Sequence, residues 1–389
     1  MPVASVTAVI ATYNRAQYLG EALDSVLGQT APPAQVIVVD DGSTDGTAAV
    51  LRGYGGRIEV IEQENGGKSR ALNRAMPRVR GEYLWIFDDD DIALPDNVER
   101  HRAVLDVHPE LGFVYSGCSV IRVHADGRVE HRGRMPVPRV SEDALFPSML
   151  EQNFMQQQGM LVRTRCYAEV GPFDESLDRG QDYEMNLRLA RRFPGRGLDR
   201  ASFVYRQHEG LRGRPGTQFS PRERGRSWIE SNRRLLRRLH AELDLAEYLP
   251  RSPDMGPLDR PLRRRALLQR ACVMARCALW EEALADFADA LGDAGTPLSA
   301  DEKGMCQRAL EKYIQHHVAI DGLLDNRPLA RRFTRLVTDA RHADAQRIFA
   351  RPLARYAWEQ LVRGRPLRAG HALFLARQVG GGRPLGCIS

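Results

Sequence analysis

Short apolar runs alternate with amphipathic segments along the first quarter of the chain. The runs are rich in Val and Ile and apolar throughout, which is typical of strands covered on both faces. The segments between them carry apolar residues at helical spacing, so each predicts a helix with one face on a sheet. This alternation, with short loops, predicts a doubly wound, mostly parallel α/β sheet. The predicted strands are Val3 to Ala11, Val36 to Val39, Ile58 to Ile61 and Tyr83 to Phe87, and the helices between them begin near Asn14 (the expected N-cap), Asp45 and Lys68.

Four consecutive carboxylates, Asp88 to Asp91, follow the fourth predicted strand directly. In open α/β sheets, ligands bind beyond the carboxyl ends of the strands, and clustered carboxylates there need a positive charge. Oxygen ligands of this kind suit Mg²⁺ or Mn²⁺, so the cluster predicts a divalent metal site. The alternative is an acid-rich start of the next helix, which runs through about Val107. That explains Asp96 but not four acids in a row.

Two other loops at predicted strand ends carry polar residues. Asp40 and Asp41 end the second strand and lead into Gly42-Ser43-Thr44. Gly66 and Gly67 follow the third strand, and Lys68 and Arg70 open the next helix. Backbone N–H groups at a helix start suit a phosphate, although Gly-Gly before a helix is also common punctuation.

The later elements are less regular. Residues 113–123 and the stretch from Val129 predict a hairpin around Asp126-Gly127. From about Arg222 the pattern is helical almost throughout, with a break at the proline-rich residues 250–257. The predicted helices run to about Tyr248 and over Arg260 to Leu291, Ala300 to Leu324, Pro328 to Phe349 and Leu353 to Gln378.

The order and spacing of these motifs resemble family 2 of the glycosyltransferases. The resemblance rests on Val9 to Arg15, Val38 to Thr47, Gly67 to Asn73 and Gly81 to Asp91, and it covers roughly residues 3–210. It implies a GT-A fold, a nucleotide-sugar donor, a divalent metal, transfer of hexosyltransferase type and inversion at the anomeric carbon. We therefore expect a GT-A catalytic domain over 1–221 and an all-α domain over 222–389.

Site roles follow from the resemblance, position by position. It places Thr12, Tyr13 and Arg15 after the first strand on the donor side, with Asp40 holding the nucleobase and Asp41 beside it. Lys68 and Arg70 lie where the family's donor loop runs, although many members have Arg where this chain has Leu72. Asp88 and Asp90 match the Asp-x-Asp motif, whose first acid meets the ribose and whose second meets the metal. Asp89 is expected on the donor side, and Asp88 and Asp91 are further candidates for the metal.

Asn153 to Arg163 resembles the family strand that runs under the acceptor site. Two further segments complete the expected site. In Gly171 to Leu189, Asp182 matches the family's general base, whereas Gln181 replaces the usual Glu. The alternative for Asp182 is a cap on the helix Tyr183 to Arg192. His208 matches a His that closes over the metal or diphosphate, and His is a better ligand for Mn²⁺ than for Mg²⁺. Arg206, Arg212 and Arg214 are candidates for neutralising phosphate.

Charge separates the two halves of the chain. Residues 1–221 carry 26 Lys and Arg against 30 Asp and Glu, whereas residues 222–389 carry 30 against 20, so net charges of −4 and +10 make up the total of +6. The basic half suits an anionic membrane surface, a peptide acceptor, a dimer contact or packing on the catalytic domain, and the sequence leaves these open. An Arg-rich solvated surface is the plain alternative. The sequence shows no strongly amphipathic, Lys- and Trp-rich helix.

The remaining composition narrows the setting. The six cysteines have no metal or redox spacing, so we expect free thiols in a reducing compartment. No signal peptide or long apolar run is present, so a cytoplasmic protein, in peripheral contact with the inner face of the membrane at most, is expected. No zinc-finger or RNA-binding motif accompanies the basic half, so no nucleic acid is expected.

The expected reaction transfers a sugar, with UDP as the commonest donor nucleotide, to a saccharide or lipid-linked acceptor of the bacterial envelope. A peptide or small-molecule acceptor is the second hypothesis. A nucleotidyltransferase is a remote alternative, because that class places a Gly-rich loop where this chain has Thr12 to Arg15. A non-catalytic nucleotide-sugar-binding protein is another, against which the intact set of acids argues.

Overall fold

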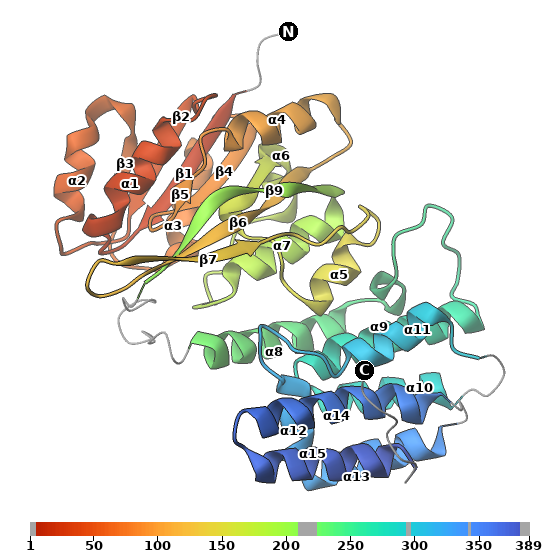
Figure 1. Ribbon diagram of the computed structural model, residues 1–389. Helices are drawn as coiled ribbons and strands as arrows, with labels where there is room; N and C mark the ends of the chain where they lie inside the picture. Colours follow the sequence, from red (N-terminus) through yellow and green to blue (C-terminus); the bar gives the residue numbers. More distant parts are fainter. Residues whose placement is uncertain (1–4, 209–223, 293–296, 341–343, 382–389) are drawn as a thin grey trace. The chain divides into compact units, whose positions relative to one another are not determined.

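A computed structural model describes residues 5–208, 224–292, 297–340 and 344–381 (Figure 1). The chain divides into two compact units. The first comprises Met1–Leu145 and Asn153–Arg224, and the second comprises Phe146–Gln152 and Gly225–Ser389. The second unit thus includes a short segment from the first half of the sequence.

The first unit is built on a mixed sheet, whose order among the described residues is β3-β2-β1-β4-β8-β6-β9-β5, with β7 paired to β6. Strands β1 to β4 are parallel to one another, as the alternation of apolar runs predicts. Strand β8 runs antiparallel between β4 and β6, so the parallel half ends there. The strands are β1 (Val6–Thr12), β2 (Gln35–Asp40), β3 (Glu59–Glu62), β4 (Tyr83–Asp88), β5 (Ile92–Ala93), β6 (Phe113–Val123), β7 (Val129–Met135), β8 (Met160–Arg163) and β9 (Gly195–Gln207).

Helices and buried aromatic side chains cover this sheet. Trp85 and Phe87 occupy alternate positions of β4, so their side chains lie on the same face of the sheet. Phe203 of β9 packs on Phe87 edge to face at a ring distance of 6.4 Å. Together with Val and Ile side chains of β1 and β2 they form the core of the unit. The helices are α1 (Ala16–Leu27), α2 (Thr47–Tyr54), α3 (Lys68–Ala75), α4 (Asn97–Val107), α6 (Thr164–Val170) and α7 (Gln181–Arg192), with short 3-10 turns η1 (Gly55–Arg57), η2 (Met76–Arg78) and η3 (Gln157–Gly159).

The start of α1 differs from the expectation. Asn14 is not its N-cap, because Arg15 occupies that position and Asn14 takes a left-handed conformation with φ of 50°. The Asn14 side chain instead accepts a hydrogen bond from the backbone N–H of Thr44 at 2.8 Å. The backbone N–H of Ala16, in the first turn of α1, donates to the carboxylate of Asp45 at 3.2 Å. The helix is therefore capped from the loop after β2.

The strand expected over Asn153 to Arg163 is also shorter than predicted. Only Met160–Arg163 is extended in the sheet, because Gln157–Gly159 forms the turn η3. The buried indole of Trp85 donates to the Gln158 carbonyl at 2.8 Å, and the His101 ring lies 3.2 Å from the Gly159 carbonyl. These contacts satisfy the turn's buried backbone groups, so three glutamines remain outside the strand. The expected hairpin around Asp126-Gly127 is confirmed as β6 and β7.

The second unit is helical among its described residues. Phe349 packs edge to face on both Phe287 and Phe333, with ring distances of 5.4 and 5.3 Å. None of the described helices is long and apolar enough to cross a bilayer. The helices are α5 (Leu145–Glu151), α8 (Arg224–Glu242), η4 (Leu245–Tyr248), α9 (Arg260–Arg276), α10 (Trp280–Leu291), α11 (Ala300–Arg308), α12 (Val318–Leu324), α13 (Arg327–Asp339), α14 (Ala345–Val362) and α15 (Pro366–Val379).

Several helix ends here differ from the predicted ones. The helix expected over Arg260 to Leu291 is two helices, because Ala278 takes a positive φ of 55° between α9 and α10. The expected break before Leu353 is absent, since Pro352 lies buried inside α14 and the packing of Phe349 holds that helix together. The break comes instead at Gly364, whose φ of 69° suits glycine.

Candidate functional site

The register of the parallel strands brings three of the predicted site positions to one edge of the sheet. Thr12 of β1 lies opposite Asp40 of β2, and Ala11 of β1 lies opposite Asp88 of β4. The ends of β2, β1 and β4 are therefore neighbours at this edge. This is where ligands bind in open α/β sheets.

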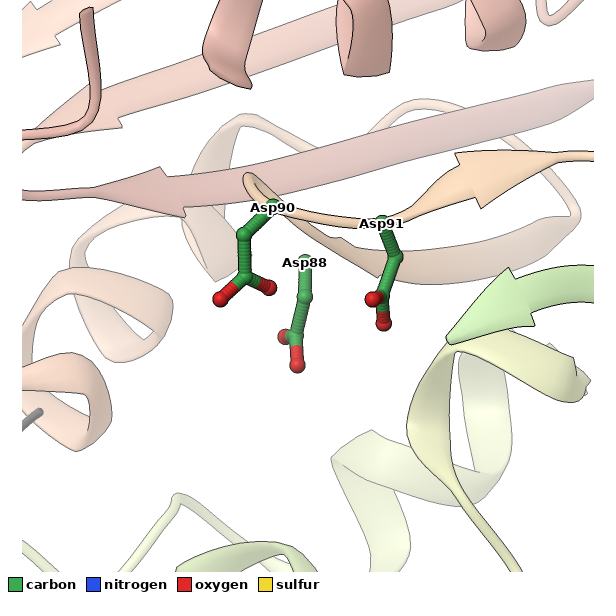
Figure 2. A group of neighbouring side chains, drawn as sticks. All are labelled: Asp88, Asp90 and Asp91. Carbon is green, nitrogen blue, oxygen red and sulfur yellow. The ribbon is translucent and has the colours of Figure 1, made fainter. Parts of the chain in front are cut away.

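Asp88, Asp90 and Asp91 form the centre of the candidate site. One carboxylate oxygen from each lies within 4.8 Å of the others, and Asp90 and Asp91 are buried. Figure 2 shows the three side chains leaving the end of β4 and the loop to β5 and pointing to the same side. The Nε2 atom of buried His208 lies 2.9 Å from Asp90 Oδ2. Three carboxylates and one imidazole fit a divalent cation such as Mn²⁺ or Mg²⁺.

Two basic side chains offset part of this negative charge. Lys68 Nζ forms an ion pair with Asp88, and Arg15 Nε lies 4.0 Å from Asp89. Burial, together with the neighbouring charge of Asp90, still raises the pKa of Asp89 to about 7. Burial is the larger cause of this rise and the neighbouring carboxylate of Asp90 the second, so Arg15 offsets the rise only in part.

Gln158 is a site residue whose role the sequence did not show. Its amide nitrogen donates to Asp88 and to Asp91, the latter at 3.0 Å. The side chain is buried, and the Trp85 indole fixes its backbone. The only signal in the sequence is the run Gln156 to Gln158, which marks polar contacts without indicating which glutamine makes them. Gln158 therefore ties η3 to two of the acids.

Asp40 and Asp41 have different surroundings. Asp41 accepts hydrogen bonds from Gln63 at 2.7 Å and from the backbone N–H groups of Gly66 and Gly67 at 2.8 Å each. Asp41 thus shapes the loop that leads to Lys68. The Asp40 carboxylate accepts a hydrogen bond from the backbone N–H of Ser43 at 2.9 Å. The predicted donor contacts of both acids stay predictions.

The structure does not bring every predicted donor residue to the acids. Arg70 is exposed on α3, with its side chain folded against Gly66. Leu72, where many family members have Arg, is fully buried in the core. Tyr13 is half-buried in the loop after β1. Lys68 is thus the basic residue of this segment that meets the cluster.

Asp182 lies in the first turn of α7, whose N-cap is Gly180 in the left-handed region. The N-cap position thus belongs to Gly180, while the Asp182 carboxylate accepts hydrogen bonds from the backbone N–H groups of Tyr183 and of Asp182 itself in the first turn. Burial raises the pKa of Asp182, and the nearby positive charge of Lys68 opposes that rise. Lys68 is thus shared electrostatically between Asp88 and Asp182.

The last predicted residues lie at the end of β9. The Arg206 guanidinium pairs with Glu21 and sits 4.8 Å over the Tyr18 ring, while its backbone N–H donates to Asp91 at 2.8 Å. Its side chain therefore has protein partners, and its backbone helps to place an acid. Arg212 and Arg214 lie outside the described residues.

Comparison with known proteins agrees with this architecture. The sequence model of the family described as "Glycosyl transferase family 2" matches residues 7–167, which contain β1, β2, β4 and the acid cluster. Residues 7–167 are a family 2 glycosyltransferase domain. An uncharacterized glycosyltransferase of Rickettsia typhi is 32% identical over 209 residues, covering 53% of this chain and 62% of that protein. The chondroitin synthase of Pasteurella multocida is 30% identical over 188 residues, covering 48% of this chain and 19% of that protein.

A solved structure has a similar fold. The crystal structure of S. aureus TarS 1-349 in complex with UDP-GlcNAc aligns with a TM-score of 0.50 at 16% identity, covering 97% of this chain and 92% of that one. The first unit thus has the GT-A fold of this glycosyltransferase family, followed by a helical region. The chain spans less than two thirds of the length of the curated relatives named above.

Proposed function

We propose that this protein is a metal-dependent, inverting glycosyltransferase that transfers a sugar from a UDP-sugar to an acceptor hydroxyl. The observation that carries the proposal is the cluster of Asp88, Asp90 and Asp91 at the strand ends of a family 2 domain. Asp182, with its raised pKa, adds a second kind of acid to the same unit. A transferase of this kind needs one set of acids for the donor and another for the proton.

The donor would bind along the strand ends. Thr12, Tyr13 and Asp40 would contact the nucleoside, and Lys68 and Arg15 would face its negatively charged part. Asp90 and His208 would hold Mn²⁺ or Mg²⁺, with Asp88 and Asp91 within reach, and the imidazole favours Mn²⁺. When bound, such a cation stabilises negative charge on the departing diphosphate, where it matters most in the transition state.

Asp182 would act as the general base. As a carboxylate it accepts the proton of the acceptor hydroxyl while the hydroxyl oxygen attacks the anomeric carbon and the bond to the diphosphate breaks. Attack from the face opposite the leaving group inverts the configuration. Lys68 would tune this base, because its positive charge favours the carboxylate form.

Names of similar proteins support the substrate classes. TarS was crystallised with UDP-GlcNAc, which is in keeping with a UDP-sugar donor. Chondroitin and hyaluronan synthases of Pasteurella multocida are polysaccharide synthases by name, which supports a saccharide acceptor. We place the reaction in bacterial envelope polysaccharide or glycolipid assembly, in the cytoplasm, where thiols such as the five described free cysteines stay reduced. A peptide or small-molecule acceptor is the second candidate.

A thermal-shift panel tests the donor site. UDP, GDP, dTDP and CMP are each added with and without Mn²⁺ to the intact chain, to Asp90→Ala and to Asp96→Ala. Asp96 is the matched control, because it lies six residues further on and its side chain is partly exposed and paired with Arg100. We expect UDP to raise the melting temperature only with Mn²⁺ and only where Asp90 is present. Stabilisation that is equal in all three proteins, or absent with every nucleotide, would contradict the proposal.

A further inference from the structure

Exposed apolar side chains gather on the last two helices of the second unit. Of the large hydrophobic residues that are exposed in the described part of the chain, six of ten lie between residues 358 and 374. Trp358 is 66% exposed and Phe374 is 63% exposed. The other four are Leu361, Val362, Leu367 and Leu373. Concentrated apolar exposure of this kind marks an interaction site rather than ordinary surface.

Four of the six residues lie close along the chain to the turn between α14 and α15. Gly364 N–H donates to the Leu361 carbonyl and Arg365 N–H donates to the Gln360 carbonyl, each at 2.9 Å, so the turn is well defined. Trp358, Leu361 and Val362 precede this turn, and Leu367 follows it directly. Phe374 lies two helical turns beyond Leu367, on the same face of α15. We call the six residues, with the exposed arginines beside them, the α14–α15 surface.

The core does not need these side chains. The inward faces of the two helices are already apolar and buried, through Phe349 and Tyr356 of α14 and Ala372 and Ala376 of α15. Each helix is therefore apolar on two faces, one packed inward and one facing solvent. Because apolar residues lie on both faces, neither helix has one apolar and one polar side. The sequence therefore shows no strongly amphipathic helix here.

Charge identifies the kind of partner. Residues 345–379 contain seven arginines and one acid, Glu359. Glu359 already pairs with Lys312 and His317 inside the unit. The arginines Arg347, Arg351, Arg355, Arg363, Arg365 and Arg377 are exposed. A second copy of the chain would bring like charges together on this surface, whereas an anionic partner complements it.

We propose that the α14–α15 surface docks on an anionic phospholipid membrane. Trp and Phe side chains favour the boundary between headgroups and acyl chains, and neighbouring arginines bind lipid phosphates. The exposed apolar side chains distinguish a membrane from a dissolved polyanion, because they add nothing to binding the polyanion. Membrane docking uses both these side chains and the arginines. The proposal does not rest on transferase activity, so it is tested separately from the proposed function.

Vesicle flotation of the full chain tests the docking. The vesicles are phosphatidylcholine alone or an equal mixture of phosphatidylcholine and phosphatidylglycerol, in low and in raised NaCl. We expect binding only to the mixed vesicles, weakened by salt. Replacing Trp358 and Phe374 together by Ser, or Arg363 and Arg365 together by Gln, should each lower the partition coefficient roughly tenfold. A control with Val107→Ser and Arg52→Gln changes an exposed apolar residue and an exposed arginine of the first unit, and it should bind like the parent.

A second measurement uses the unmodified protein. Brominated lipids in the mixed vesicles quench tryptophan fluorescence on contact; of the other tryptophans, Trp85 and Trp280 are buried and Trp228 is half-buried. We expect quenching in the parent and much less in Trp358→Phe. Equal flotation of the parent and the Trp358 and Phe374 variant would overturn the proposal in favour of a polyanion site, and no flotation of the parent would overturn it outright. Concentration-dependent dimers that are lost in that variant, without vesicle binding, would overturn it in favour of a second copy.

Discussion

Removing the Gln158 amide perturbs the acid cluster without changing its charge. The amide donates to Asp88 and Asp91 from a buried position. A hydrogen bond to a charged group contributes about 1.5–3 kcal/mol, so we expect Gln158→Ala to lower the free energy of unfolding of the metal-free first unit by roughly 3 kcal/mol or more. For a unit of this size, 3 kcal/mol corresponds to a melting temperature lower by roughly 6–12 °C.

Scanning calorimetry with a chelator, and then with Mn²⁺, measures this change. A bound cation satisfies the same carboxylates, so we expect Mn²⁺ to shrink the difference between Gln158→Ala and the parent. Gln158→Glu adds a further carboxylate to the cluster, so it should be the least stable variant without metal and should gain the most from Mn²⁺. Gln156→Ala is the matched control, because it removes a half-buried glutamine two positions away. If Gln158→Ala melts within a degree or so of Gln156→Ala under chelation, the amide does not hold the acids and the reasoning fails.

Three further outcomes are expected. Asp182→Asn should lower kcat by about 10²- to 10⁴-fold while leaving stabilisation by nucleotide and Mn²⁺ intact in a thermal-shift assay. Because the pKa of Asp182 is raised above 3.8, the parent's kcat/KM should fall on acidification at a higher pH than it would with an ordinary aspartate as the base. Lys68→Met removes a positive charge that lowers the pKa of Asp182, so the pH profile of this variant should shift to higher pH still. In the second unit, Arg264 holds the pKa of buried Glu302 below 4.5, so the pair stabilises the fold fully above that pH and loses this contribution as the pH falls through the lowered pKa. Calorimetry should therefore find Glu302→Gln less stable than the parent at neutral pH, with a gap that closes in acid.

The parallel half of the fold and the place of the site follow from local pattern alone. Apolar runs identify β1, β2 and β4, and parallel strands bring their carboxyl ends to one edge. Thr12, Asp40 and Asp88 were therefore expected at one edge once the strands were assigned, and the register shows that their strands are also neighbours there. No knowledge of side-chain contacts is needed for this step.

Contacts between residues far apart in sequence could not be predicted in the same way. Gln158 meets Asp88 across 70 positions, and Asp45 caps α1 from the loop after β2. A sequence pattern shows that Gln and Asp seek partners, but each has several within reach of a folded chain. Asn14 illustrates the limit, because a residue suited to an N-cap hydrogen-bonds a neighbouring loop instead.

The segment Phe146–Gln152 changes how the helical unit should be dissected. Glu151 forms an ion pair with Arg308 at 2.9 Å and accepts a hydrogen bond from Gln269 at 2.8 Å, and both partners belong to the helical unit. Gln158, which holds two of the acids, follows Glu151 by only seven residues along the chain. A chain that ends near residue 224 would leave Glu151 without these partners and free the start of the stretch that leads to Gln158. Loss of activity on truncation would therefore not show that the helical unit binds the acceptor, whereas exposed-residue variants of that unit keep Glu151 anchored and can separate the two effects.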